Sequence, residues 1–247
     1  MTLEDLLHFT LHCHRTCTTK NVKDFCVTFA TTQEHFDRVV SSGRQVYTLV
    51  PKGKIFLPKD IAVLARVRPL EVDDPKNLFI LFHNFVNRRE PMPCTIWPEK
   101  CVVHPSACIA AEGMRWMRIG GELTKMKHMG TVEMMEGVEV GAFTVIHRGT
   151  IDNTIIGENV KIGSNCSIGH NCIIGKDTMI TSGVNIAGSV TIGKRCWIGV
   201  GTSVRDNISI CDRVRIGHGS VITKSITESG TYFGNPAKRR GEYDGRI

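Results

Sequence analysis

An aliphatic residue returns at every sixth position between Ile156 and Ile222, and this repeat constrains the fold more than any other feature of the sequence. All twelve of these positions hold Ile or Val, and the residue four places after each is small or β-branched. Gly directly follows seven of the twelve. An amphipathic helix repeats its apolar face about every 3.6 residues, and a half-buried strand alternates at every second residue. A period of six therefore indicates a different structure from either.

A triangular parallel β-helix has this period, because each repeat makes one short strand and one corner, and three repeats complete one coil. The aliphatic side chain points inward and the small residue four places later fills the space beside it. Successive coils stack at a strand spacing of about 4.8 Å, so residues three repeats apart in sequence become vertical neighbours. We predict a mainly β fold with a parallel β-helix over residues 101–227. Inward positions then hold three buried thiols, Cys166, Cys172 and Cys196.

The register slips once inside the repeat. It runs through Val140 and Ile146, but the next aliphatic anchor, Ile156, follows ten residues later instead of six. Four extra residues within "HRGTIDNT" must leave the prism as a loop, and such loops often carry binding residues. A second excursion is expected near residues 114–130.

The chain outside the repeat predicts two further parts. Residues 1–100 mix the strand-like "VYTLV" and "IAVLARV" with the helix-like "PKNLFILFHNFVNR", which indicates a small N-terminal α/β domain. The Pro-rich "EPMPCTIWP", residues 90–98, is the expected linker. Residues 228–247 form a short polar C-terminal tail.

Composition narrows the classes of function. The net charge of +7 is spread along the chain and no nucleic-acid motif accompanies it, so we interpret the charge as phosphate handling or as plain solubility. No signal peptide and no run of eighteen apolar residues is present, so we expect no membrane span and a cytoplasmic protein. The ten cysteines are too sparse for a disulfide scaffold and are expected to be reduced. The "HCHRTC" stretch, residues 12–17, lacks a second ligand pair, so we expect no metal there and an amphipathic helix over "LEDLLHFTLHC", residues 3–13.

The stretch from Val140 to Ile210, with its "RGTIDNT" slip and its "GHN" corner, resembles the UDP-3-O-acylglucosamine N-acyltransferases of lipid A synthesis. It is equally similar to their shorter relatives, which acetylate nucleotide-linked amino sugars. The resemblance covers residues 24–238 and is strongest in the repeats. It implies a left-handed β-helix, a homotrimer with clefts between subunits, and an N-terminal domain that binds the nucleotide.

His170 is the candidate catalytic base. It lies two places after Ile168, at a corner that faces out of the prism, and the resemblance implies catalysis for the "GHN" histidine. A neutral imidazole can take the proton that an attacking amine must lose near pH 7. Gly188 stands three repeats later, directly above on the next coil. Its backbone N–H is the candidate donor to the oxyanion of the tetrahedral intermediate.

For the acceptor, the resemblance implies a nucleobase against Phe29, with Thr32 and His35 beside it, where the family usually has Asn and Tyr. Stacking of an aromatic ring on a base is physically reasonable, and a plain core role for Phe29 is the alternative. His147, at the mouth of the slipped loop, either touches the acceptor or is a surface residue. The remaining acceptor candidates are His128, Arg148 and Asn171.

For the donor, the tail "GNPAKRR" resembles the endings of hexapeptide acetyltransferases that use acetyl-CoA. The chain lacks the long C-terminal helices with which the lipid A enzymes engage acyl carrier protein, and Asn207 stands where those enzymes have a second histidine. These departures favour a CoA thioester as donor. The basic candidates for its phosphates are Arg205, Arg215, Lys224 and Lys238.

We therefore predict an N-acyltransferase, in particular an N-acetyltransferase, that acts on a nucleotide-linked amino sugar for a surface glycan. One alternative is an enzyme of lipid A synthesis that takes its acyl group from acyl carrier protein. Another is a non-enzymatic β-solenoid that binds a sugar. A γ-type carbonic anhydrase is disfavoured because no His pair in the repeats has its ligand spacing. A nucleotidyltransferase is disfavoured because residues 1–100 contain no Gly-rich phosphate loop.

Overall fold

The computed structural model describes residues 16, 26–42, 44–54, 69–87, 95, 97–243 and 245. The chain forms two compact units, one comprising Met1–Pro91 and Met114–Lys127, the other Met92–Gly113 and His128–Ile247. Three expectations lie outside the described residues, either wholly or in most of their length. They are the helix over residues 3–13, the "IAVLARV" strand and the 90–98 linker.

The first unit is built on a three-stranded parallel sheet of β1 (Cys26–Phe29), β2 (Val46–Pro51) and β3 (Pro69–Val72), in that order. Helix α2 (Gln33–Ser41) begins where the Thr32 hydroxyl accepts a hydrogen bond from the backbone N–H of His35 at 3.3 Å. Helix α4 (Pro75–Val86) begins in the same way at Asp74 and packs against β1 and β2. The predicted strand "VYTLV" and the predicted helix "PKNLFILFHNFVNR" are both confirmed.

A β-hairpin from the middle of the chain belongs to this first unit. Strands β6 (Trp116–Ile119) and β7 (Glu122–Lys125) pair antiparallel. Two hydrogen bonds tie the end of the hairpin to α4, from the Asn84 side-chain amide to the Lys125 carbonyl at 2.8 Å and from the Lys127 N–H to the Asn84 side-chain oxygen at 2.9 Å. The second excursion expected near residues 114–130 is therefore this hairpin, which packs with the α/β unit and not with the prism.

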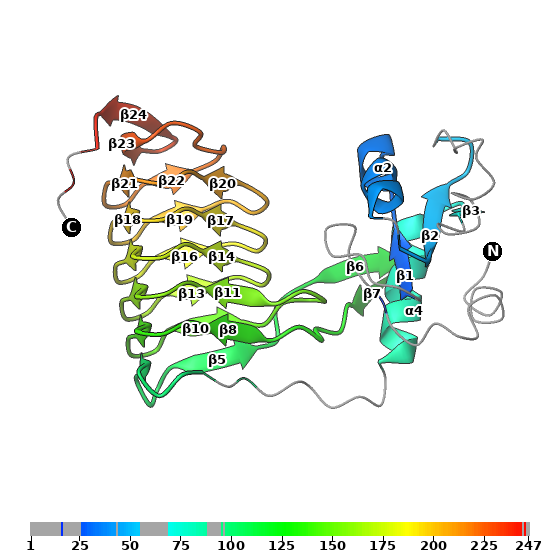
Figure 1. Ribbon diagram of the computed structural model, residues 1–247, viewed down its shortest axis with the longest axis horizontal. Helices are drawn as coiled ribbons and strands as arrows, with labels where there is room; N and C mark the ends of the chain where they lie inside the picture. The colour runs from blue at the N-terminus through cyan, green and yellow to red at the C-terminus, as the bar shows by residue number, and fades with distance from the viewer. Residues whose placement is uncertain are drawn as a thin grey trace. The chain divides into compact units, whose positions relative to one another are not determined.

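The second unit is a prism of stacked coils with three sheets, whose strands pair parallel except for the terminal antiparallel pair β23–β24 (Figure 1). Each coil contributes one strand to each sheet, and vertical neighbours are three repeats apart, as in the pairing of Ile168 with Ile186. The first sheet contains β5 (Cys108–Ala111), β10 (Val145–His147), β13 (Ser167–Ile168), β16 (Asn185–Ile186), β19 (Ser203–Val204) and β22 (Val221–Ile222). The second contains β8 (Val132–Met134), β11 (Thr154–Ile156), β14 (Ile173–Ile174), β17 (Thr191–Ile192) and β20 (Ser209–Ile210). The third contains β4 (Val102–Val103), β9 (Glu139–Val140), β12 (Lys161–Ile162), β15 (Met179–Ile180), β18 (Trp197–Ile198), β21 (Val214–Ile216), β23 (Gly230–Gly234) and β24 (Ala237–Gly241).

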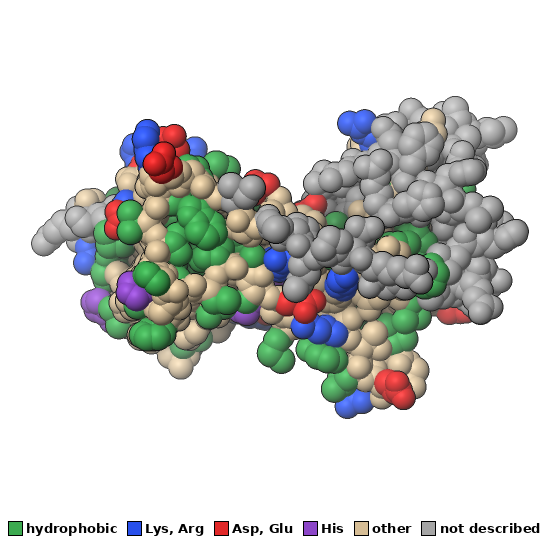
Figure 2. All heavy atoms as spheres, turned by 90° about the horizontal axis from the view of Figure 1, so that it is seen from below, with side chains coloured by type: hydrophobic (Ala, Val, Ile, Leu, Met, Phe, Trp, Pro, Cys, Tyr) green, Lys and Arg blue, Asp and Glu red, His purple; other side chains and the backbone are tan. Residues whose placement is uncertain are grey.

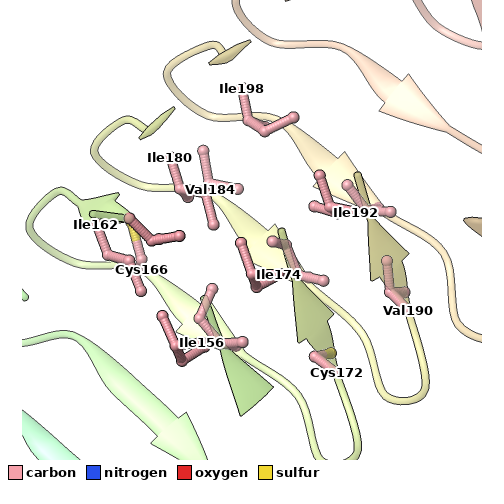
Figure 3. Close-up of a cluster of buried hydrophobic side chains, with 14 of the residues drawn as sticks. Ile156, Ile162, Cys166, Cys172, Ile174, Ile180, Val184, Val190, Ile192 and Ile198 are labelled. Atoms are coloured by element: carbon pink, nitrogen blue, oxygen red, sulfur yellow. The ribbon is translucent and has the colours of Figure 1, made fainter. Parts of the chain in front are cut away.

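The interior of the prism is the predicted aliphatic ladder. All twelve sixth-position side chains are buried, and those labelled in Figure 3 point into the space between the sheets. The small residues beside them bury their polar atoms with partners, as when the Thr178 hydroxyl donates to the Gly193 carbonyl at 2.8 Å. The predicted fold class, mainly β with a left-handed parallel β-helix, is confirmed.

The corners explain two further features of the repeat. The third residue after the aliphatic adopts positive φ at many corners, and it is often Asn or Asp, which tolerate this conformation better than other side chains, for example Asn165 and Asn171. The Gly that follows the aliphatic is required by close packing between coils. A Cβ on Gly169 would lie 2.6 Å from the backbone nitrogen of Gly188 in the coil above.

The cysteines divide into two groups. Cys26 in β1 is disulfide-bonded, so the expectation of reduced thiols is wrong at this residue. Cys166, Cys172 and Cys196 are free and buried in the prism, where the sequence placed them. Burial raises the pKa of Cys172 to about 11. It therefore keeps this thiol protonated and unreactive at neutral pH.

Candidate functional site

The slipped loop leaves the prism between β10 and β11 and is held by hydrogen bonds at both ends. At its start, the Arg148 N–H donates to the Ala111 carbonyl at 2.9 Å, and the Arg148 Nε donates to the Ala110 carbonyl at 2.8 Å. At its end, the Thr154 hydroxyl donates to the His147 carbonyl at 2.7 Å. Arg148 is buried, so its side chain packs inside the structure and does not project from the surface.

Asn171 connects this loop to the corner of the next coil. Its side-chain oxygen accepts from both the N–H and the hydroxyl of Thr150, at 3.1 and 3.0 Å, and its amide nitrogen donates to the Asp152 carbonyl at 2.8 Å. Its own N–H donates to the Thr154 hydroxyl at 2.9 Å. These four hydrogen bonds fix which side-chain atom of Asn171 is the oxygen, because Asp152 offers only an acceptor there.

The same oxygen sets the tautomer of His170. His170 Nδ1 lies 2.9 Å from Asn171 Oδ1. Because that oxygen can only accept, Nδ1 carries the hydrogen in the neutral ring and Nε2 carries the lone pair. Nε2 lies against Gly188, where a Cβ would be only 2.6 Å away. The half-buried ring thus has its basic nitrogen beside the backbone of the coil above.

Neighbouring corners indicate the direction of the Gly188 N–H. At the equivalent corner residues, the Lys194 N–H donates to the Asp212 carboxylate at 2.8 Å and the Val200 N–H donates to His218 Nδ1 at 3.1 Å. Each acceptor is the corner side chain three repeats ahead, so these N–H groups are directed at the corner residue of the next coil. For Gly188 that residue is Asp206, whose carboxylate accepts a hydrogen bond from the Asn207 side chain.

His128 meets His170 from the other side. Its ring is completely buried and lies 5.5 Å from that of His170, edge to face at 72°. The Glu112 carboxylate accepts from the His128 N–H at 3.2 Å and lies 3.7 Å from Nδ1 of its ring. Sequence reasoning named His128 but missed Glu112 and the adjacent Gly113, because both precede the regular repeat and no spacing relates them to the corner.

His147 lies at the base of the slipped loop, as expected from its position in the sequence. It is half-buried at the end of β10, and its Nδ1 is buried with no hydrogen-bond partner among the described residues. Its ring therefore lies partly beneath the loop and not wholly on the surface.

The nucleotide candidates lie together at the carboxyl end of β1. Phe29 ends the strand and is half-buried, with its ring centroid 4.9 Å from that of Phe79 in α4. Thr32 caps α2, and His35 lies in the first turn of that helix. The carboxyl edge of a parallel sheet is where ligands bind in open α/β folds. Phe29 is thus both packed on the core and partly exposed, which is compatible with a core residue and with a ring that stacks on a nucleobase.

The four basic candidates fall at three places. Lys224 lies two residues after the aliphatic of β22, in the same vertical column as His170 and Gly188. Arg205 lies on the coil between those of Gly188 and Lys224, one residue before this column. Arg215 lies on β21 in another sheet, with its guanidinium 4.7 Å from the Trp197 ring centroid. Lys238 lies on β24 in the terminal hairpin. Only Arg205 and Lys224 share the corner of His170.

The described residues contain neither a group of metal-ligand side chains nor a helix suited to cross a membrane. No three or more His, Cys, Asp or Glu side chains are grouped so as to hold a metal ion in that part of the chain. Among the helices described, none has the length and apolarity needed to cross a membrane.

Comparison with known families identifies the repeat. The model of the bacterial transferase hexapeptide, six repeats, matches residues 153–188 and 189–224. The part of the prism between residues 153 and 224 matches the repeats of this family model. This match confirms, at the level of the hexapeptide family, the resemblance that the sequence suggested.

Curated relatives that share these hexapeptide repeats are named UDP-3-O-acylglucosamine N-acyltransferase. The protein of that name from Herminiimonas arsenicoxydans is 39% identical over 147 residues, which is 59% of this chain and 42% of the relative. That of Paracidovorax citrulli is 41% identical over 63 residues, 26% of this chain and 19% of the relative. The chain thus matches less than half the length of these relatives.

Solved structures with hexapeptide prisms are also similar. UDP-N-acetylglucosamine O-acyltransferase from Moraxella catarrhalis is 22% identical, covers 60% of this chain and 73% of its own, and has a TM-score of 0.48. A variant of perosamine N-acetyltransferase from Caulobacter crescentus, solved with CoA and GDP-perosamine, is 20% identical. It covers 90% of this chain and 99% of its own, with a TM-score of 0.35.

Proposed function

We propose that the protein is an N-acyltransferase that moves an acetyl group from acetyl-CoA to the amine of a nucleotide-linked amino sugar. The observation that carries this proposal is the corner formed by His170 and Gly188, where the imidazole Nε2 lies against the Gly188 backbone of the adjoining coil. The names of the curated relatives, all N-acyltransferases of a nucleotide sugar, support the reaction class.

The roles follow from the chemistry of a thioester and an amine. The amine nitrogen attacks the thioester carbonyl carbon, and His170 Nε2 accepts the proton that the nitrogen loses. Asn171 holds the opposite nitrogen, so the imidazolium that forms keeps a charge-assisted hydrogen bond. The Gly188 N–H donates to the carbonyl oxygen as it becomes negative. Collapse of the tetrahedral intermediate breaks the C–S bond and releases CoA as the thiol after protonation.

The substrates extend from this corner in two directions. Arg205 and Lys224 stand above His170 on later coils, where they can meet the phosphates of the donor. His147 and the slipped loop lie beside this corner on the preceding coil and contact the acceptor. Phe29, Thr32 and His35, at the carboxyl end of β1, are the candidates for contact with a nucleotide base within the α/β unit. The cleft is completed by a neighbouring subunit of a homotrimer.

A second candidate donor is an acyl group on acyl carrier protein. One relative, 39% identical over 147 residues, is named UDP-3-O-acylglucosamine N-acyltransferase, and this likeness supports the second candidate. Purified protein offered a panel of nucleotide amino sugars with acetyl-CoA, longer acyl-CoAs or acyl carrier protein thioesters separates the two. Faster turnover of acyl carrier protein thioesters would replace the donor that we propose.

Thiol release by a His170→Ala variant tests the mechanism itself. We expect the rate with the best donor and acceptor to fall on the order of 10²-fold or more, because the general base is lost. His218→Ala is the matched control, since His218 is also a corner histidine of the prism that contacts an aromatic ring, but it lies on a different corner. A His170→Ala enzyme as fast as wild type rules out our mechanism. A wild-type protein that binds nucleotide sugars but turns over no donor supports the non-enzymatic alternative.

A further inference from the structure

A second imidazole is buried beside the proposed base, and the mechanism above gives it no task. His128 has no solvent exposure, so its ring does not contact a substrate directly. It is nevertheless within 5.5 Å of the His170 ring, centroid to centroid. A buried polar ring in contact with a reactive group is costly to place there unless it has partners, which makes its surroundings informative.

Glu112 is the polar partner that holds His128. One carboxylate oxygen accepts from the backbone N–H of His128 at 3.2 Å and lies 3.7 Å from Nδ1 of its ring. Glu112 is itself about a quarter exposed, with 27% of its side chain accessible. The carboxylate therefore fixes both the main chain and the ring of His128 while remaining partly solvated.

Gly113 makes the space in which the two rings meet. A Cβ at this residue would lie 2.8 Å from Nε2 of His128 and 3.2 Å from Cδ2 of His170. The backbone of Gly113 has no positive φ, so packing against the rings, and not backbone conformation, excludes a side chain here. The pair of histidines and this glycine form one tightly fitted group.

The His170 ring is thereby bounded on three sides. Asn171 holds Nδ1, the Gly188 backbone lies at Nε2, and His128 with Gly113 lies at the Cδ2 edge. A rotation of the ring about its Cβ–Cγ bond would swing Nε2 away from the proposed oxyanion site, and the Cδ2 edge would have to move into His128. The contact thus opposes the motion that would spoil the reaction geometry.

We propose that His128, fixed by Glu112 in a space that Gly113 leaves open, is a positioning residue that keeps the Nε2 of His170 aimed at the reacting amine. This inference rests on the proposed function and deepens it, since it assigns to His170 a support that the acyl transfer needs. It predicts an effect on turnover and not on substrate affinity, because His128 contacts no substrate.

Three variants test the proposal. His128→Ala removes the support, Gly113→Ala drives a methyl group between the rings while leaving both in place, and His128→Gln restores an amide near the position of Nε2. We expect kcat to fall on the order of 10- to 100-fold in the first two, with KM for both substrates within about two-fold of wild type. His128→Gln should recover part of the loss, and His218→Ala should leave both constants unchanged.

A spectroscopic measurement supplies a readout that does not depend on turnover. Nitrogen-15 NMR of the histidine rings reports which nitrogen of His170 is protonated. We expect a single Nδ1–H tautomer in wild type, as Asn171 dictates, and a mixture of tautomers or a shifted titration in His128→Ala and Gly113→Ala. If one of these variants fails to fold, the other and His128→Gln carry the test.

The outcomes separate this inference from the proposed function. An active wild type whose His128→Ala and Gly113→Ala variants retain kcat within about two-fold overturns the positioning role alone. A wild type that is inactive with every donor overturns the proposed function. In that case, unchanged His170 ring signals in the variants overturn the positioning role as well, and altered signals uphold it.

Discussion

Asn171 is the residue on which the local geometry of the site depends most. One oxygen atom receives the Thr150 N–H, the Thr150 hydroxyl and the His170 ring, and the same side chain donates to the Asp152 carbonyl. The slipped loop and the tautomer of His170 are therefore set by a single amide. Its left-handed backbone conformation, φ 58°, places the side chain at the corner where both can be reached.

Asn171→Ala should cost both stability and rate. Thr150 is buried, and the loss of the common acceptor leaves its two donors unsatisfied, which costs about 1–3 kcal/mol in the free energy of unfolding. Asn165→Ala is the control, because Asn165 has the same positive φ at another corner and carries the same backbone penalty. Urea unfolding of the two variants measures the difference. Equal stabilities would show that the Asn171 hydrogen bonds contribute nothing beyond the backbone conformation.

The six-residue repeat predicts the positions of some site residues relative to His170 but not of others. Gly188 could be placed above His170 because a coil of three repeats fixes vertical neighbours, and the structure has Nε2 of His170 against Gly188. Glu112 and Gly113 could not be placed, because the chain before residue 132 has no regular period that relates it to the corner. The tautomer of His170 also depends on a side-chain contact with Asn171 that no spacing encodes.

Among the elements, the short strands of the prism followed directly from the sequence, whereas the excursion did not. Each strand occupies a position that the period of six defines. The β6–β7 hairpin instead docks on α4 through Asn84, which lies far upstream of its partners Lys125 and Lys127. A contact at that separation leaves no local pattern, so the sequence indicated an excursion without indicating where it packs. The period of six does not explain why Gly follows seven of the aliphatics, whereas the structure does, because the coil above excludes a side chain at Gly169.

The buried thiols of Cys172 and Cys196 make the stability of the prism sensitive to alkaline pH. Burial raises the pKa of Cys172 and of Cys196 from 9.0 to about 11. Between these values the unfolded chain has released its thiol protons while the folded chain retains them, so stability falls as pH rises through this window and is fully present below pH 9. Urea midpoints at about pH 8 and about pH 10.5 measure the loss. The double variant Cys172→Ala/Cys196→Ala is the control, because its Lys and Tyr residues still titrate in this range. An equal loss of stability with rising pH in this variant would contradict the assignment to the two thiols.

At the scale of the whole molecule, a single prism exposes apolar side chains that a soluble monomer would be expected to cover. Phe143, Val200 and Ile173 are exposed by 67%, 48% and 44%. Figure 2, which views the molecule from below, shows hydrophobic side chains at the lower end of the prism. Phe143 and Val200 share the corner between the third and first sheets, whereas Ile173 lies on the second sheet. Apolar residues on more than one side of a prism suit cyclic association, in which each copy offers one surface and receives another.

We therefore expect a homotrimer whose activity depends on assembly. Light scattering of the purified protein should give three times the 27.4 kDa of the chain. Because the proposed cleft needs a wall from a neighbouring subunit beside His170, the rate per chain should fall on dilution below the dissociation constant of the trimer and recover on concentration. Phe143→Asp should shift the same transition to higher protein concentration, and Asn165→Ala, at the corresponding corner position one coil above, is its control. A monomer with the full rate per chain would mean that the site is complete within one subunit.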